Sequence, residues 1–241
     1  MTLVKTIKKH STKSYKKISS KFRFNRYFSS NTYFGLKFFK KLYNRNTYLG
    51  TTLNMIIDGK KEAQLLRDEI KKEIESLKSK NNKVPGLTVI LIGDFEPSKI
   101  YVKNKEKNAK EVGINSDVIR YAKDVTEQEV LNKIKELNNN KDVSGILVQL
   151  PLPPQINKEK IINAINPLKD VDGFHPINVG NLSSGYNATV PCTPLGCLLL
   201  IKKIESNLSG KHAVIIGRSN LNGKPMAQLL LKENCTVSIV H

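Results

Sequence analysis

The sequence of 241 residues contains no tryptophan, only three cysteines and no long hydrophobic run. No stretch approaches the roughly eighteen apolar residues of a transmembrane helix, so we expect no membrane-spanning segment and no membrane partner. The cysteines form no Cys-x-x-Cys pair, and three is a poor number for a disulfide framework. The four histidines are too scattered to read as ligands, so we expect free thiols and no metal site.

Acidic residues are absent from the first 57 residues of the chain. Residues 1–54 contain thirteen Lys or Arg and no Asp or Glu, whereas the remainder has 27 basic and 21 acidic residues. A basic, serine-rich leader without a compact apolar core is typical of an organellar import peptide, so we expect a disordered mitochondrial targeting leader over 1–54. One alternative is a cytoplasmic protein with a mis-assigned start before Met55. Another is a nucleic-acid-binding arm, in which Tyr and Phe alternate with basic residues.

Helix-like and strand-like patterns alternate after Met55. Short apolar runs predict strands over 87–93, 115–122 and 144–150, and helical spacing predicts helices over 59–80, 98–112 and 126–140. Thr126 and Glu129 have the spacing of a capping box. Strand–helix–strand–helix–strand order predicts a parallel sheet with helices on both faces. Ligands bind such sheets beyond the carboxyl ends of the strands.

The later part of the chain predicts a second α/β unit. A loop-rich region over 167–194 precedes a helix over 194–205, a strand over 212–217, a helix over 226–233 and the start of another strand. Two strands are fewer than a dinucleotide-binding sheet needs. We therefore expect an α/β protein with two α/β domains: an N-terminal parallel-sheet catalytic domain over 55–190, and a Rossmann-like dinucleotide domain, incomplete in this chain, over 191–241.

One of the five lysines in SKIYVKNKEKNAKEVGI (98–114) stands apart. On a helical wheel, Lys105 shares an arc with Ser98, Tyr101 and Val102, while the other four lysines fall outside that arc. Burial lowers the pKa of a lysine, which suits proton transfer near neutral pH, and a fixed positive charge can stabilise a developing anion. The alternative is a lysine whose stem merely covers apolar surface.

Three further features are chemically suggestive but open to a structural interpretation. Gln149 ends an apolar strand, where a buried amide needs partners, and Asp172 lies in KDVDGF, where aspartate also commonly starts a turn. Residues 217–225, GRSNLNGKP, follow a strand and open a helix whose N-terminus attracts phosphate. Arg218 and Ser219 could add phosphate contacts, although the G-x-G-x-x-G fingerprint is absent.

Together, five segments resemble the bifunctional methylenetetrahydrofolate dehydrogenase/methenyltetrahydrofolate cyclohydrolase family. They occur in the family's order between about Met55 and His241, and the ordered set is far more specific than any one of them. The segments are S-x-x-Y-V-x-x-K (98–105), VQLPLP (148–153), KDVDGFHPINVGNL (169–182), PCTP (191–194) and GRSNLNGKPMAQLL (217–230).

The resemblance implies a role for each matching residue. Lys105 would be the catalytic lysine of the cyclohydrolase step, Tyr101 would stack on the aminobenzoate ring, and Gln149 would hydrogen-bond Lys105. Asp172 would grip the pterin, with Ser98 also at the substrate. The residues implied for the nicotinamide dinucleotide, either NADP or NAD, are Thr193, Gly217, Arg218, Ser219 and Gly223.

The resemblance also implies a reaction and an assembly. Methylenetetrahydrofolate would be oxidised by NAD(P)⁺, and the methenyl product would be hydrolysed to 10-formyltetrahydrofolate, in a homodimer without a nucleic-acid partner. Two departures are Asn222, where the family usually has valine, and the chain's end at His241, before further strands of the dinucleotide domain. They leave two alternatives: a cyclohydrolase without hydride transfer, and an inactive truncated fragment that acts as a binding or dimerisation partner.

Overall fold

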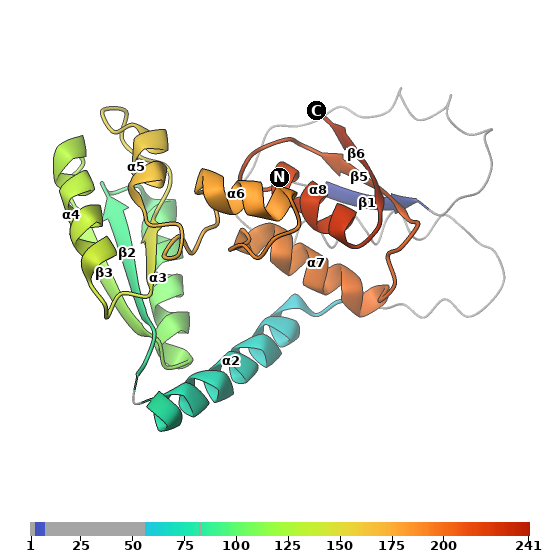
Figure 1. The fold of residues 1–241 in the computed structure, drawn as a ribbon, viewed down its shortest axis with the longest axis horizontal. Helices are drawn as coiled ribbons and strands as arrows, with labels where there is room; N and C mark the ends of the chain where they lie inside the picture. Colours follow the sequence, from blue (N-terminus) through green and yellow to red (C-terminus); the bar gives the residue numbers. More distant parts are fainter. Residues whose placement is uncertain (1–2, 8–55, 82) are drawn as a thin grey trace.

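The computed structural model describes residues 3–7, 56–81 and 83–241, which contain two three-stranded sheets with their helices (Figure 1). Most of the expected leader lies outside the described residues. Within it, however, Leu3–Ile7 forms strand β1, which pairs antiparallel with β5 of the second sheet. These five residues therefore differ from the disorder that we expected.

The first sheet is parallel throughout, with strand order β3-β2-β4. Its strands are β2 (Gly86–Ile92), β3 (Asn115–Tyr121) and β4 (Gly145–Val148). Successive side chains of a strand point to opposite faces, and both faces of β2 are buried. Val89 and Leu91 belong to one core cluster, while Ile90 and Ile92 belong to another.

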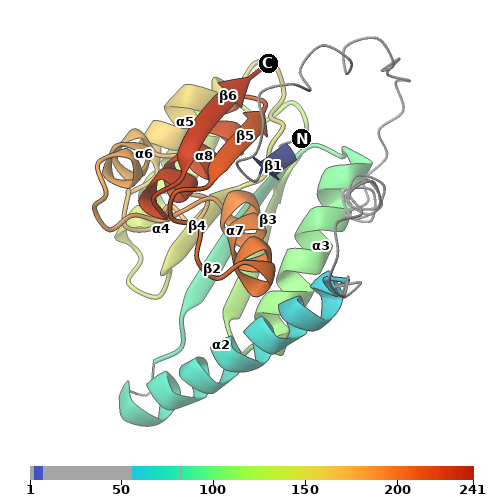
Figure 2. The ribbon, with the colours of Figure 1, turned by 90° about the vertical axis from the view of Figure 1, so that its right-hand side faces the viewer.

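Helices cover both faces of this sheet, as predicted. Helix α3 (Glu96–Glu111) contributes Val102 to the cluster of Val89 and Leu91. Helices α4 (Glu127–Asn139) and α5 (Lys158–Ala164) pack on the opposite face. Figure 2 shows α3 running beside the strands.

The predicted capping box begins α4. The Thr126 hydroxyl accepts from the Glu129 backbone N–H, and the Glu129 carboxylate accepts from the Thr126 backbone N–H. Together they satisfy two of the N–H groups that a helix start leaves without partners.

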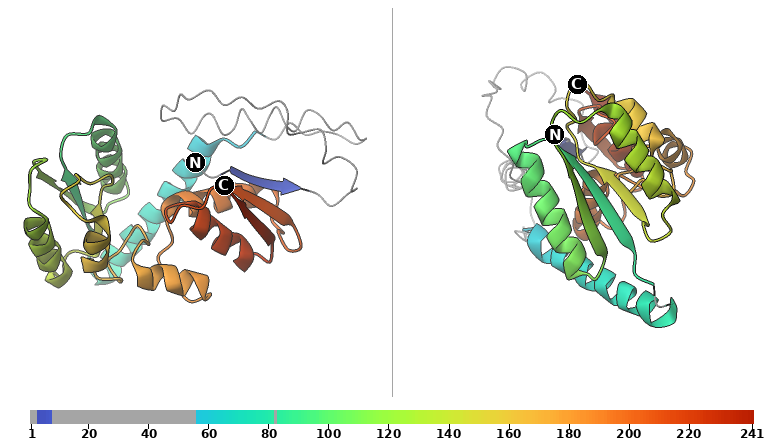
Figure 3. Two further views of the ribbon diagram at one scale, coloured as in Figure 1. Left: turned by 90° about the horizontal axis from the view of Figure 1, so that it is seen from above. Right: turned by 90° about the vertical axis from the view of Figure 1, so that its left-hand side faces the viewer.

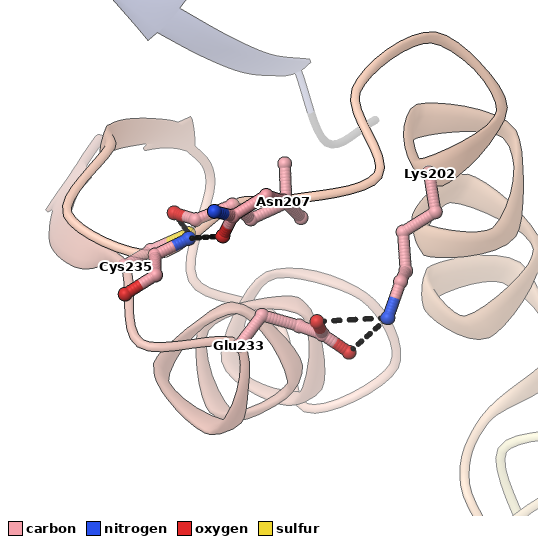
Figure 4. Close-up of polar contacts among 6 residues, drawn as sticks. Lys202, Asn207, Glu233 and Cys235 are labelled. Carbon is pink, nitrogen blue, oxygen red and sulfur yellow. Dashed lines mark hydrogen bonds and ion pairs between the residues drawn. The ribbon is translucent and has the colours of Figure 1, made fainter.

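The second sheet has the order β1-β5-β6, with β5 (His212–Ile216) and β6 (Thr236–Val240) parallel to each other. Helices α7 (Cys192–Ile204) and α8 (Gly223–Lys232) pack with these strands around a core that includes Ile215, Met226 and Leu230. Lys202 on α7 donates to both carboxylate oxygens of Glu233, which follows α8, at 2.9 and 2.8 Å (Figure 4). This ion pair joins the ends of the two helices.

Two predictions about helices in this region were wrong. The stretch 167–194, predicted as loop, contains helix α6 (Pro176–Ser183). Proline is favourable in a first helical turn, and His175 caps the helix by accepting from the Ile177 N–H through Nδ1. Helix α8 begins at Gly223, three residues before the predicted start, because Pro225 is tolerated in the first turn for the same reason.

Helix α2 (Gly59–Asn81) contacts elements of both sheets. Glu62 pairs with Lys203 of α7 at 2.9 Å, and Arg67 pairs with Glu111 of α3 at 3.6 Å. Figure 3 shows α2 extending between the two sets of elements. Helix α2 thus joins the last turns of α3 and α7.

Candidate active site

Lys105 is the lysine of α3 that turns inward. It is half-buried, whereas Lys99, Lys103, Lys107 and Lys110 are exposed, which confirms the distinction drawn from the helical wheel. Its ammonium Nζ donates to Gln149 Oε1 at 3.2 Å. The side chain therefore has a specific polar partner rather than only an apolar surface to cover.

Gln149 follows β4, and its surroundings fix its amide. Its backbone N–H donates to Ile90 O at 2.9 Å, which extends the ladder between β4 and β2 by one residue. Its side-chain Nε2 donates to Leu150 O at 2.7 Å. Because the donor end of the amide is engaged by that carbonyl, the acceptor oxygen faces the Lys105 ammonium.

Asp172 is the acidic group of this site. Burial raises the pKa of its carboxyl, the positive charge of Lys105 opposes that rise, and the negative charge of Asp170 adds to it. A carboxylate in a poorly hydrated place is costly unless it is paired or hydrogen-bonded. Asp172 is thus suited to a ligand that offers hydrogen-bond donors.

Cys192, at the first residue of α7, lies within the electrostatic range of the same groups. Although the residue is exposed, partial burial raises the pKa of its thiol. The negative charge of Asp172 raises it further, and the positive charge of Lys105 opposes this. The start of α7 therefore lies near Asp172 and Lys105.

Ser98 and Tyr101 occupy the first two turns of α3. Ser98 is buried, as the wheel predicts, with 4% of its surface exposed. Tyr101, one turn before Lys105, is 51% exposed, which differs from its expected inward orientation. It stands at the border of the buried arc, where its ring is open to a flat aromatic ligand.

The loop from β5 into α8 has the tight geometry expected of a phosphate-binding turn. Gly217 has φ +120°, and a Cβ added to Gly223 would lie 2.1 Å from Gly217 O. The Ser219 hydroxyl accepts from Asn222 N–H at 3.1 Å, and Ser219 O accepts from Lys224 N–H at 3.0 Å. Asn222, the residue before α8, makes no side-chain cap, so the helix start could receive an anion.

The remaining dinucleotide candidates are accessible. Arg218 and Ser219 are exposed in this loop, and Thr193 is exposed in the first turn of α7. Glycines that allow close backbone approach, a helix N-terminus and an exposed guanidinium are chemically suited to a diphosphate.

A small, largely apolar pocket is lined in part by Asp172 and by residues of α5. Tyr101 and Lys105 are not part of its lining, so it does not connect the candidate folate residues. Its lining residues are Ile146, Val148, Leu150, Leu152, Lys158, Ile161, Ile162, Ile165, Asp170, Asp172 and Phe174.

Sequence reasoning missed two residues of this region. Cys192 was considered only as a free thiol, although it belongs to the PCTP segment quoted for the resemblance. Asp170 was overlooked because its neighbour Asp172 carried the implied role, yet it is 4% exposed and its carboxylate accepts several hydrogen bonds. The signal available in the sequence was a second aspartate, two residues before the candidate, in KDVDGF.

No helix in 56–81 or 83–241 is long and apolar enough to span a bilayer. Within the described part of the chain, no three His, Cys, Asp or Glu side chains are grouped as metal ligands would be. The three cysteines are free thiols.

Two family models match the sequence. Residues 57–172 match the catalytic domain of tetrahydrofolate dehydrogenase/cyclohydrolase, and residues 191–241 match the NAD(P)-binding domain of the same family. The first match contains Ser98, Tyr101, Lys105, Gln149 and Asp172. The second contains all five dinucleotide candidates.

Individual relatives agree with the family models. The bifunctional protein FolD of Pelagibacter ubique is 68% identical over 187 residues, covering 78% of this chain and 66% of the relative. That of Rickettsia bellii is 53% identical over 190 residues, covering 78% of this chain and 67% of the relative. The crystal structure of the bifunctional FolD enzyme from Campylobacter jejuni superposes with a TM-score of 0.74 at 47% identity, covering 76% of this chain and 65% of that one. The chain thus spans about two thirds of the length of these relatives.

The relatives correct one expectation. Mitochondrial targeting was inferred from the basic leader, but the relatives from Pelagibacter and Rickettsia are bacterial proteins. Bacterial cells have no mitochondria, so composition alone was misleading here. Residues 8–54, on which that expectation rested, lie outside the described residues. Over the rest of the chain, the family models and the relatives agree, and the chain belongs to the tetrahydrofolate dehydrogenase/cyclohydrolase family.

Proposed function

We propose that this protein acts in one-carbon folate metabolism as a dehydrogenase and cyclohydrolase. It would oxidise 5,10-methylenetetrahydrofolate with NAD(P)⁺ and hydrolyse the resulting 5,10-methenyltetrahydrofolate to 10-formyltetrahydrofolate. The observation that carries the proposal is the hydrogen bond from Lys105 to Gln149, within the electrostatic range of Asp172. It supplies a positioned, half-buried cationic side chain within the electrostatic range of an acidic one.

Lys105 would carry the hydrolytic step. Water adds to the carbon held between the two folate nitrogens, one carbon–nitrogen bond breaks, and a proton passes to the leaving nitrogen. A lysine placed at that carbon can orient the ring and move this proton. The bond to Gln149 uses one Nζ hydrogen and leaves the rest of the amino group for the substrate.

The neighbouring side chains would bind and orient the folate. Gln149 keeps Lys105 in place, because its amide is itself fixed by Leu150 O. Asp172 would accept hydrogen bonds from the pterin, which would stabilise its partly buried carboxylate. Tyr101 would stack on the aminobenzoate ring, and Ser98 would line the substrate site near the start of α3.

The second sheet would hold the nicotinamide cofactor, which accepts the hydride when it is bound. The residues that would hold it are Thr193, Gly217, Arg218, Ser219 and Gly223. Their support is the close approach of Gly223 to Gly217 O and the exposure of Thr193, Arg218 and Ser219. NAD⁺ and NADP⁺ are both compatible with this proposal.

We further propose a catalytic domain over residues 55–190, a dinucleotide-binding domain that starts at residue 191, and a homodimer. The assembly rests on the family resemblance. Light scattering coupled to size-exclusion chromatography tests it directly: a mass of two chains is expected, and a monomer at assay concentration would contradict it.

Two assays on the purified full chain test the function. One follows hydrolysis of 5,10-methenyltetrahydrofolate, and the other follows reduction of NAD⁺ or NADP⁺ by 5,10-methylenetetrahydrofolate. Activity in both supports the proposal, while hydrolysis alone would favour the cyclohydrolase that lacks hydride transfer. Activity in neither, with binding of tetrahydrofolate retained, would favour a binding or dimerisation partner.

A further inference from the structure

A second aspartate, Asp170, precedes Asp172 by two residues and is more deeply buried. Asp170 is 4% exposed. It lies beside β4: Ile146 of β4 forms a parallel bridge with Asp170, and the Ile146 N–H donates to Lys169 O at 2.7 Å. The backbone at this aspartate is therefore attached to the edge of the first sheet. None of the roles assigned above uses its carboxylate.

The Asp170 carboxylate accepts three hydrogen bonds from the segment that follows it. Gly173 N–H donates to Oδ1 at 3.1 Å, His175 N–H donates to Oδ2 at 2.8 Å, and Asn178 Nδ2 donates to Oδ2 at 2.9 Å. We call these four residues the Asp170 cluster. Asn178, itself 6% exposed, also donates to Pro167 O at 2.9 Å, which ties α6 to the segment preceding the aspartate.

Asp172 lies inside the loop that this cluster closes, and packing fixes both of its neighbours. A Cβ on Gly145 of β4 would lie 2.4 Å from Val171 Cγ1, so Val171 packs directly on the strand backbone. Gly173 has φ +68°, and a Cβ there would lie 2.5 Å from Thr189 O. The backbone on each side of Asp172 is thus held by contacts that leave little room.

We propose that Asp170 is the positioning residue for Asp172: its carboxylate closes the loop through Gly173, His175 and Asn178, and so holds Asp172 within the electrostatic range of Lys105. The charge of Asp170 also raises the pKa of the Asp172 carboxyl, after burial and against Lys105. Asp170 therefore sets both the place of that carboxyl and part of its environment. This inference rests on the proposed role of Asp172 in folate binding.

The isosteric change Asp170→Asn tests the role of the carboxylate. An asparagine offers one acceptor oxygen and one NH₂ group, whereas the cluster presents three donors. At least one donor would then face the NH₂ group and lose its acceptor. An unsatisfied buried donor destabilises the network, although the substitution hardly changes the volume of the side chain. A matched control is the reverse substitution, Asn138→Asp. The Asn138 side-chain amide is also hydrogen-bonded: it donates to Ala164 O and accepts from the Asn166 N–H.

Two readouts on the full chain report on Asp172. The first is the Kd for tetrahydrofolate by calorimetry. The second is the rate at which iodoacetamide alkylates Cys192, resolved from the other cysteines by peptide mass spectrometry. Cys192 is exposed, and the side-chain charges that shift its thiol pKa are those of Asp172 and Lys105. Moving the Asp172 charge away from Cys192 lowers the pKa of the thiol and so increases the thiolate that iodoacetamide attacks. This effect does not require bound folate.

We expect Asp170→Asn to weaken tetrahydrofolate binding about tenfold, a coupling of the size found between residues in contact. It should also accelerate alkylation of Cys192, as Asp172→Asn does, while Asn138→Asp changes neither. In the Asp172→Asn background, Asp170→Asn should add little to either readout. If Asp170→Asn does not fold, Asn178→Ala removes one donor of the same cluster and should shift both readouts in the same direction.

The proposal is overturned if Asp170→Asn leaves both readouts at their wild-type values, or if it keeps its full effect in the Asp172→Asn background. Failure of the proposed function has a different signature. The wild-type chain would then not bind tetrahydrofolate, while the alkylation of Cys192 would still show whether Asp170 controls the position of Asp172.

Discussion

At the scale of single residues, Lys105 differs from the other lysines of α3 in its partner as well as in its burial. Periodicity identified it because a helix repeats every 3.6 residues, so one face could be read from the sequence. Periodicity could not predict the contact with Gln149, which the family resemblance implied and the structure confirms, or the approach of Asp172. These residues come from three distant segments, and only the fold brings them together.

Asp172 gives a prediction about stability and pH. Its pKa is raised in the folded protein, mainly by burial, so the folded state binds this proton more tightly than the unfolded state does. The carboxyl is therefore most favourable to folding below the ordinary aspartate pKa of about 3.9, and it becomes unfavourable as the pH rises through its folded pKa. Asp172→Asn should raise the Tm at pH 7, and the gain should shrink toward pH 4.

Thermal unfolding of the wild type and of Asp172→Asn across this pH range measures the effect. Asp124→Asn, the same change at an exposed position, serves as the control. A Tm for Asp172→Asn below that of the wild type at pH 7 would mean that the carboxylate is well stabilised in the folded protein, contrary to the pKa direction.

At the scale of elements, the predictable parts were those with strong local signals. The capping box at Thr126 and Glu129 fixed the start of α4, and the apolar runs fixed the strands. Helix α6 was missed because eight residues with a central Gly180 have little periodicity, and tertiary contacts supply its stability. Leu3–Ile7 was missed because its partner β5 lies far along the chain.

The start of α8 gives a prediction about a glycine. Because a Cβ on Gly223 would lie 2.1 Å from Gly217 O, Gly223→Ala must displace the loop or the helix. We expect the free energy of unfolding to fall by about 1–3 kcal/mol, as in other overpacked sites. Binding of NAD⁺ or NADP⁺ should weaken as well, since the same loop holds the candidate cofactor residues.

Gly180→Ala is the matched control. A Cβ on Gly180 of α6 would meet open space, and alanine is favoured over glycine inside a helix by roughly 0.5–1 kcal/mol. Urea denaturation of both variants should therefore give changes of opposite sign. Equal stability of Gly223→Ala and the wild type would show that the loop is looser than the structure indicates.

At the scale of the whole molecule, the uneven charge was visible in the sequence but its meaning was not. The mitochondrial interpretation used composition alone, and bacterial relatives overturned it. The folded segments matched a family because several motifs recur in a fixed order, which composition cannot imitate. Helix α2, which pairs with α7 through Glu62 and with α3 through Arg67, shows how elements of both sheets are joined.

The charge distribution predicts the effect of removing the leader. Deleting residues 1–54 takes away thirteen basic residues and no acidic ones, so the formal net charge falls from +19 to +6. Any retention on RNA at low salt should be lost, because such binding depends on released counterions. The Kd for tetrahydrofolate should not change. Salt-dependent RNA binding that persists after the deletion would place a nucleic-acid surface on residues 55–241.

The most direct test of the account is hydrolysis of 5,10-methenyltetrahydrofolate by the Lys105→Met variant. Methionine keeps much of the length of the side chain but removes the amino group that donates to Gln149. Lys107→Met, the same change at an exposed position of the same helix, is the control. We predict that Lys105→Met binds tetrahydrofolate nearly as the wild type does and loses hydrolysis, while Lys107→Met keeps both. Hydrolysis by Lys105→Met at a near wild-type rate would contradict the assignment of the catalytic lysine.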